Sequence, residues 1–289
     1  MINFCPSPAG KPTSNPDLQK SGRQGSLSIL YTLALVTVCA AQVQADETVD
    51  ATDPTKIYSF VGGGLKYNEY TNAEYMWELR ATGNIGLSES DMILFEGGYG
   101  KHRGNQAEGS STGVTRLRFR WFHLFDMNYE LDRGYRGSGT ALDVQLAGTL
   151  KGQDGQNVIV FGGMPVWALG GDWNLYLQLN VANTWDKTFD NWNGIGPGFN
   201  AQFIYSPDNW WPGAQIRIVP GYIYWAAGEF EGNGSGELEI NIGGSFTPKV
   251  TWDVTAQKNF DKDLKSLRRE PSSNLANDWN IFFNASVYF

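Results

Sequence analysis

The last eleven residues, Trp279–Phe289, place the strongest constraint on the fold of this chain. Every odd position in this segment is apolar or aromatic, whereas the even positions include Asn280, Asn284 and Ser286. A period of two residues predicts a β-strand with one apolar face and one wetter face. The rest of the chain then has to supply the strands that lie beside it.

The same alternation recurs from residue 57 onward, with turn signals at roughly 10–14-residue intervals, a rhythm typical of all-β sandwiches and barrels. It is clearest over residues 73–87, where Trp77 and Leu79 share the apolar face while Glu78 and Arg80 share the other. Twelve strands are predicted, at residues 57–67, 73–87, 91–100, 113–122, 139–150, 157–168, 173–181, 195–206, 213–225, 235–246, 250–260 and 279–289. Residues 157–168 are apolar on both faces, so their orientation is ambiguous. Segment 123–138 is hard to place and could hold a further strand, which would make the total odd.

The connections between the predicted strands alternate in length. The short turns are 88–90, 169–172, 206–212 and 247–249, and the long polar segments are 101–112, 185–194, 226–234 and 261–276. Aromatic residues also gather near strand ends, as in the girdles that border the apolar band of a membrane barrel. A secreted β-sandwich would alternate too, but nothing in it demands aromatics at strand ends. The sequence therefore predicts an all-β fold, a closed antiparallel transmembrane β-barrel of about 12 strands.

The N-terminus predicts a division into three parts. Residues 1–26 are polar and carry basic side chains, residues 27–41 are apolar, and Val43-Gln44-Ala45 supplies small residues for cleavage. Residues 1–45 are therefore interpreted as a signal peptide rather than a buried helix. Acidic residues 46–56 form a periplasmic lead-in, and residues 57–289 form the barrel. Both cysteines lie in the predicted leader, which excludes a disulfide framework and a cysteine-based zinc site in the mature chain.

The charge and the histidines argue against several functions. The formal net charge is −8, and removal of the predicted leader makes it more negative, which argues against a nucleic-acid partner. The two histidines are His102 and His123. His102 lies near serines 110 and 111 and Glu108, but this arrangement is interpreted as a solvated loop. The sequence shows no metal-ligand cluster and no phosphate-binding motif, so no catalytic residue, metal or cofactor is predicted.

Charged residues occupy the face of the predicted strands that would point into the barrel. Arg116, Arg118 and Arg120 alternate with large apolar residues, and placing these arginines toward lipid would cost about 2–4 kcal/mol each near the midplane. The predicted pore-lining residues are Glu74, Glu78, Arg80, Glu96, Arg116, Arg118, Arg120, Asp143, Arg217, Glu237, Glu239 and Asp253. Two interpretations stay open and are compatible. The arginines face acids across a water-filled pore and orient polar solutes, or they pair with neighbouring strands and fill the lumen.

The C-terminal strand that ends on Phe289 resembles the outer-membrane β-barrels of Gram-negative bacteria, over roughly residues 56–289. This resemblance implies the bacterial outer membrane as location, its lipid and the barrel-assembly machinery as partners, and Phe289 as the assembly signal. Residues 177–194 followed by 203–225 are similar to the nucleoside-specific channel family, and residues 84–96 to the porin-like family of aromatic-compound degradation. The function expected is a channel for passive or facilitated diffusion of small polar solutes. The alternatives are a non-conducting structural or surface-binding barrel and, less favoured, an outer-membrane enzyme.

Overall fold

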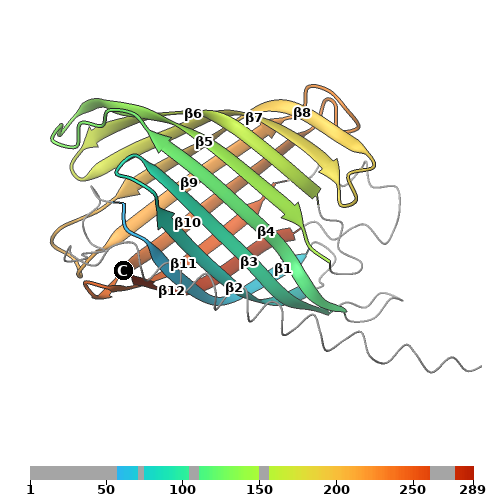
Figure 1. The fold of residues 1–289 in the computed structure, drawn as a ribbon, viewed down its shortest axis with the longest axis horizontal. Coiled ribbons are helices and arrows are strands. Elements are labelled where there is room, and N and C mark those ends of the chain that lie inside the picture. Colours follow the sequence, from blue (N-terminus) through green and yellow to red (C-terminus); the bar gives the residue numbers. More distant parts are fainter. Residues whose placement is uncertain (1–56, 71–74, 104–110, 150–155, 261–276) are drawn as a thin grey trace, which may run out of the picture. The chain divides into compact units, whose positions relative to one another are not determined.

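The structure is a computed structural model that describes residues 57–70, 75–103, 111–149, 156–260 and 277–289. The described residues form twelve β-strands in one closed sheet (Figure 1). They are β1 (Phe60–Tyr70), β2 (Tyr75–Gly86), β3 (Asp91–Arg103), β4 (Ser111–Leu124), β5 (Gly134–Ala147), β6 (Gln156–Gly170), β7 (Trp173–Asp186), β8 (Trp192–Tyr205), β9 (Gln215–Tyr224), β10 (Gly234–Thr247), β11 (Val250–Asn259) and β12 (Asn277–Tyr288). The predicted signal peptide and lead-in lie outside the described residues.

The sheet closes because the first and last strands pair. Each strand is antiparallel to its neighbours along the chain, and β12 pairs with β1 from Phe60↔Tyr288 to Glu69↔Trp279. Closure gives every strand two partners, so no edge is left with unpaired backbone groups. The predicted antiparallel barrel of twelve strands is confirmed. The first residue of β1 and the last residue of β12 lie at the same end of the barrel, which is called the terminal end. The opposite end is called the loop end.

The segment that was hard to place in sequence, 123–138, adds no strand among the described residues. β4 extends through Leu124, a turn follows, and β5 begins at Gly134 rather than at residue 139. The turn is held by backbone bonds, with Phe125 donating to the Ser138 carbonyl at 2.8 Å and Asn128 to the Arg136 carbonyl at 2.7 Å. The first strand also starts later than predicted, at Phe60. The strand total is therefore even, as in bacterial single-chain barrels.

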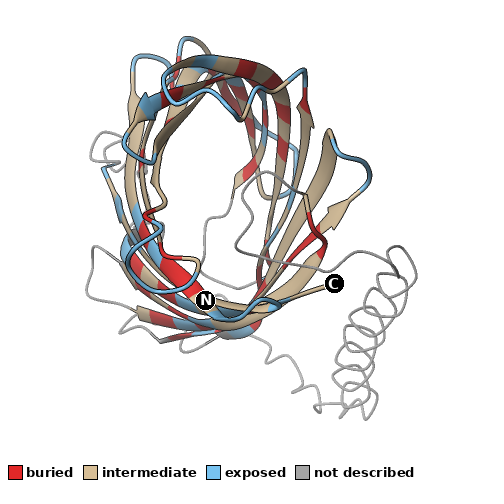
Figure 2. Ribbon diagram, turned by 90° about the vertical axis from the view of Figure 1, so that its left-hand side faces the viewer, coloured by how far each residue is buried: buried red, intermediate tan, exposed pale blue. Residues whose placement is uncertain are grey.

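Alternation along each strand separates an apolar exterior from a polar interior. On β2 the side chain of Leu79 is 66% exposed, whereas its neighbour Glu78 is 2% exposed, and the same contrast of exposed and buried positions recurs around the barrel (Figure 2). Phe246 on β10 reaches 70% exposure. An apolar exterior on this scale matches a hydrocarbon environment and not water. No helix in the described part of the chain is long and apolar enough to cross a membrane.

Aromatic side chains form rows at both ends of the barrel. At the terminal end, Trp173 stacks on Tyr205 with ring centroids 4.9 Å apart, and the row continues through Trp210, Trp211 and Trp252 at spacings of 5.4–6.3 Å. At the loop end, the Tyr67 ring lies 5.0 Å from Trp77 and 5.3 Å from Trp279. Amphipathic rings at these levels fit the two interfaces of a membrane.

Part of the barrel interior, on the inner side of β6 and β7, is apolar rather than polar. On β6, Ile159 and Phe161 are exposed outward, so Val160 faces inward, where it packs with Ala182, Trp225 and Phe230. The last two side chains belong to the connection between β9 and β10. Backbone bonds hold this connection against β8, among them Ile195 to the Ala227 carbonyl at 3.0 Å and Phe230 to the Asn193 carbonyl at 2.9 Å. An apolar cluster therefore covers the inner side of β6 and β7.

Candidate functional site

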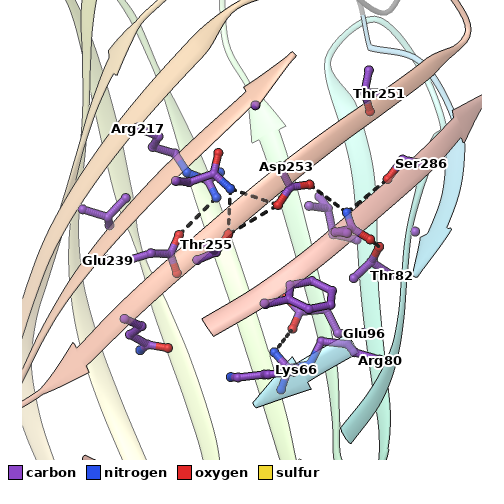
Figure 3. Close-up of a pocket in the computed structure, with 18 of the residues that line it drawn as sticks. Lys66, Arg80, Thr82, Glu96, Arg217, Glu239, Thr251, Asp253, Thr255 and Ser286 are labelled. Atoms are coloured by element: carbon purple, nitrogen blue, oxygen red, sulfur yellow. Dashed lines mark hydrogen bonds and ion pairs between the residues drawn. The ribbon is translucent and has the colours of Figure 1, made fainter. Parts of the chain in front are cut away.

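A cavity of about 500 Å³ lies inside the barrel, beside the strands that the apolar cluster leaves uncovered (Figure 3). Its lining comes from β1 to β5 and from β8 to β12, together with Gly213 of the β8–β9 turn. Most of the lining side chains are charged, amide or hydroxyl groups, because they occupy the inward positions of alternating strands. A polar cavity enclosed by an apolar exterior is the arrangement of a water-filled lumen.

Most of the residues predicted to line a pore lie at this cavity. Nine of them line it, namely Arg80, Glu96, Arg116, Arg118, Arg120, Arg217, Glu237, Glu239 and Asp253. Glu78 and Asp143 are buried and pair with the cavity-lining residues Arg80 and Arg118. Glu74 lies outside the described residues. Whether this set lines a conducting pore stays a prediction.

The positive side of the cavity is called the arginine wall here. It consists of Lys66 on β1, Glu78 and Arg80 on β2, Glu96 on β3, Arg116, Arg118 and Arg120 on β4, and Asp143 on β5. Pairing of β3 with β4 sets Glu96 opposite Arg118, between the two other arginines of β4. Alternation keeps all three arginines on one face, so a single carboxylate meets the whole row.

Glu96 is the centre of the arginine wall. Its Oε1 lies 2.6 Å from Arg120 and 3.9 Å from Arg118, and its Oε2 lies 3.0 Å from Arg116. A fourth guanidinium, that of Arg80, lies 3.6 Å from the same Oε2. One carboxylate therefore bridges four arginines, which would otherwise repel one another at close range.

Two further carboxylates lie behind the arginines. Arg118 donates from Nε to both oxygens of Asp143, at 2.9 and 3.0 Å, and a terminal nitrogen contacts the same carboxylate. Arg80 donates from Nε to Glu78 at 2.6 Å. Gly98 on β3 makes room for this pair, because a Cβ at that position would collide with the Glu78 carboxylate. These acids orient the guanidinium groups that reach the cavity.

The opposite side is called the acidic wall and consists of Arg217 on β9, Glu237, Glu239 and Asn241 on β10, Asp253 and Gln257 on β11, and Asn284 on β12. Arg217 pairs with Glu239 at 3.1 Å. Glu237 accepts a hydrogen bond from the Gln257 amide at 2.6 Å. Asp253 accepts from Asn284 at 2.8 Å and from Asn241 at 3.0 Å. Within the described chain, Glu237 and Asp253 form no ion pair, so neutral amides hold them.

The two walls face each other at β4 and β10 and meet where β1 pairs with β12. β4 and β10 are six positions apart in a ring of twelve strands, which places them on opposite sides of the lumen. The arginine wall holds five cations against three acids, and the acidic wall holds one cation against three acids. The excess charge is therefore opposite in sign on the two sides, and a field crosses the lumen.

Sequence reasoning did not single out Lys66 or the amides of the acidic wall. Lys66 is 4% exposed and lines the cavity, and it shares the inward face of β1 with Gly64 and Asn68. Strand parity could have found it, since Leu65 and Tyr67 are apolar neighbours on the other face. Phe282 also faces inward, with the Arg80 guanidinium 5.5 Å from its ring centroid.

Among the described residues, His123 is not arranged with a serine as a nucleophilic pair. Nδ1 of His123 lies 2.9 Å from one Asp91 oxygen, and the Ser88 hydroxyl donates to the other at 3.1 Å. The carboxylate thus stands between serine and histidine, whereas activation of a serine requires the histidine in the middle. His102 lies on β3 opposite Ser111 of β4 in the strand register, as its predicted proximity to that serine implied, whereas its other predicted neighbours, Glu108 and Ser110, lie outside the described residues. Among the described residues, no group of histidine, cysteine and acidic side chains is placed to hold a metal ion.

Comparison with known proteins identifies the fold. No known protein family and no curated protein matches the sequence. Among solved structures, an outer-membrane channel from Pseudomonas putida F1 superposes with a TM-score of 0.53 and 12% identity, over 85% of this chain and 100% of that one. The KdgM porin in complex with disordered oligogalacturonate gives a TM-score of 0.48 and 8% identity, over 79% and 99% of the two chains. The chain has the fold of porin-like bacterial outer-membrane barrels.

Proposed function

We propose that this protein is an outer-membrane channel through which small polar solutes diffuse. The observation that carries the proposal is a charged cavity inside a closed barrel whose exterior is apolar. An apolar exterior supports insertion into lipid, and a polar interior supports passage of water and solutes. The resemblance in fold to an outer-membrane channel from Pseudomonas putida F1 is consistent with this role.

Selection in such a channel depends on the groups that line the lumen. A solute that enters loses part of its hydration, and the charged and amide groups of the two walls replace it. Twelve strands enclose more space than the filled barrels of eight strands and less than the wide porins of sixteen to eighteen. A narrow, charge-lined passage is expected to favour small polar solutes. Transport of this kind requires neither a catalytic residue nor a cofactor.

One observation favours a second candidate, a non-conducting barrel. Glu96 ties four arginines together, and Arg118 is further fixed by Asp143, so paired side chains occupy part of the lumen. If these pairs fill the cross-section, the barrel is a structural or surface-binding element. The two candidates differ in one measurable property, which is ion conductance.

Purified protein in planar lipid bilayers tests the channel directly. Wild-type protein is expected to produce stepwise conductance. Thr255 lines the cavity, so T255W should reduce the step, while V254W places the same bulk on the outward face of the same strand and serves as the matched control. Absence of conductance in wild-type protein would support the non-conducting barrel, whereas equal effects of the two variants would mean that ions do not pass through the cavity at Thr255.

We propose further that Phe289 is read by the barrel-assembly machinery and that outer-membrane lipid surrounds the folded barrel. The Phe289 amide donates to the Ser59 carbonyl at 3.0 Å, which places this residue where the barrel closes. Deletion of Phe289 should lower the amount of heat-modifiable folded protein in outer membranes several-fold, while F289Y, which keeps an aromatic ring, should preserve it. An unchanged level after deletion would remove this role.

A further inference from the structure

Lys66 is a cation on the arginine wall without a direct partner. Its side chain is buried and lines the cavity. Within the described residues, no hydrogen bond or ion pair reaches its ammonium group, although Glu78 lies opposite Lys66 in the pairing of β1 with β2 and Glu96 lies one strand further, on β3. Those two carboxylates are already engaged by arginines. Burial of an unpaired ammonium costs free energy that a bound anionic group would offset.

On the acidic wall, by contrast, two carboxylates lack a cation in ion-pair contact among the described residues. Glu237 is held by the Gln257 amide, and Asp253 by the amides of Asn241 and Asn284. Amide donors satisfy carboxylate lone pairs but do not neutralise the charge. Within the described chain these two carboxylates have no cation in ion-pair contact. A bound ammonium group would supply that charge.

We propose that the lumen binds small zwitterionic solutes, with the carboxylate of the solute at Lys66 on the arginine wall and its ammonium group at Glu237 and Asp253 on the acidic wall. This inference rests on the proposed channel and names its solute class. In the closed sheet, Lys66 on β1 lies two strands from Asp253 on β11 and three strands from Glu237 on β10, so a solute that carries both charges meets an attractive group at each end.

A balance of charge favours a zwitterion over an ion of one sign. Six cations and four acids line the cavity, and Glu78 and Asp143 add two acids behind the arginines, so the fixed charges of the site cancel. An anion would meet the arginine wall favourably but the acidic wall unfavourably, and a cation the reverse. The cavity of about 500 Å³ falls within the usual range of small-molecule sites.

Three probes of equal chain length separate these possibilities. They are ε-aminocaproate, which carries both charges, hexanoate, which carries the carboxylate alone, and hexylamine, which carries the ammonium group alone. Dissociation constants are measured by saturation-transfer nuclear magnetic resonance on the full barrel refolded in detergent micelles. The zwitterion is expected to bind on the order of tenfold more tightly than either singly charged probe, because each of these loses one of the two attractions.

Variants assign each end of the probe. K66Q should weaken binding of ε-aminocaproate and hexanoate and leave hexylamine unchanged, whereas E237Q/D253N should weaken ε-aminocaproate and hexylamine and leave hexanoate unchanged. K101Q removes an exposed lysine on β3 and is the matched control. Equal affinity for all three probes, absence of binding by the zwitterion, or equal effects of K66Q and K101Q would overturn the inference. Equilibrium binding in micelles does not require conductance, so failure here is distinct from failure of the channel proposal.

Discussion

The arginine wall and the acidic wall line the same lumen but are built differently. On the arginine wall, charge compensates charge, since Glu96 contacts four guanidinium groups and Asp143 fixes one of them from behind. On the acidic wall, neutral amides donate to Glu237 and Asp253, and Arg217 pairs with Glu239. The first wall is a network of ion pairs in which each part depends on the others, whereas the second is joined by hydrogen bonds from neutral amide and hydroxyl groups.

This difference has consequences for stability. Removing one partner of a buried ion pair leaves a charge that nothing compensates, and the cost exceeds the worth of the pair itself. Removing the charge of an amide-held carboxylate leaves polar groups that can rearrange or hydrate. Equivalent substitutions on the two walls should therefore have unequal effects, and the predictions below compare them from the largest effect to the smallest.

The largest effect is expected from E96Q. The substitution keeps the shape of the side chain but removes the negative charge that four arginines share, so the free energy of unfolding should fall by about 3–5 kcal/mol. The matched change on the acidic wall, D253N, should cost about 1–2 kcal/mol, since its partners are neutral. Urea unfolding in lipid vesicles measures both. Equal losses of unfolding free energy would show that ion pairs on one wall and neutral hydrogen bonds on the other stabilise the barrel equally.

A smaller loss of unfolding free energy is expected at the pair of Arg118 and Asp143, where the coupling between the two side chains can be measured. Each single variant, R118Q or D143N, is expected to lower the free energy of unfolding by about 3 kcal/mol, because it removes the nearest partner of a largely buried charge. The double variant should lose about 3–5 kcal/mol rather than the sum of about 6 kcal/mol, which corresponds to a coupling energy of about 1–3 kcal/mol in a double-mutant cycle. If the losses of the single variants simply add, the two side chains act independently and the network description fails.

The fold could be predicted from sequence because strand alternation survives in a membrane barrel. Leu117 and Phe119 point outward, and the alternating Arg116, Arg118 and Arg120 point inward, as the pattern on β4 indicated. The predicted twelve strands and their closure followed from repetition of this signal. The boundaries were less accurate, as at β5, where Gly134 and Tyr135 extend the strand into a segment without clear alternation.

Contacts between distant parts of the chain could not be predicted in this way. β6 is apolar on both faces because Trp225 and Phe230, from a connection far along the chain, cover Val160 on the inside. Nothing in the local pattern of β6 reveals that cover. Similarly, parity placed Glu96 inside the barrel, but its contact with four arginines depends on the register between strands. Register is set by the whole sheet, which composition does not show.

The smallest effect on stability is expected at Arg217 on the acidic wall. Its guanidinium pairs with Glu239 at 3.1 Å, and about a third of each side chain is exposed to the lumen, with values of 33% and 27%. Pairs with this much solvent contribute about 1 kcal/mol or less, so R217Q should barely change the unfolding midpoint. A loss comparable to that of R118Q would mean that the acidic wall is also a tightly coupled network.

The reversal potential of single channels in a salt gradient tests the central claim most directly, because it reports which wall dominates the charge that moving ions meet. R116Q/R120Q leaves Glu96 in contact with Arg80 and Arg118 and should shift the potential toward cation preference. E237Q/D253N should shift it toward anion preference. Shifts of opposite sign would support two oppositely charged walls around one conducting lumen. Shifts in the same direction, or none in channels that conduct, would contradict that account.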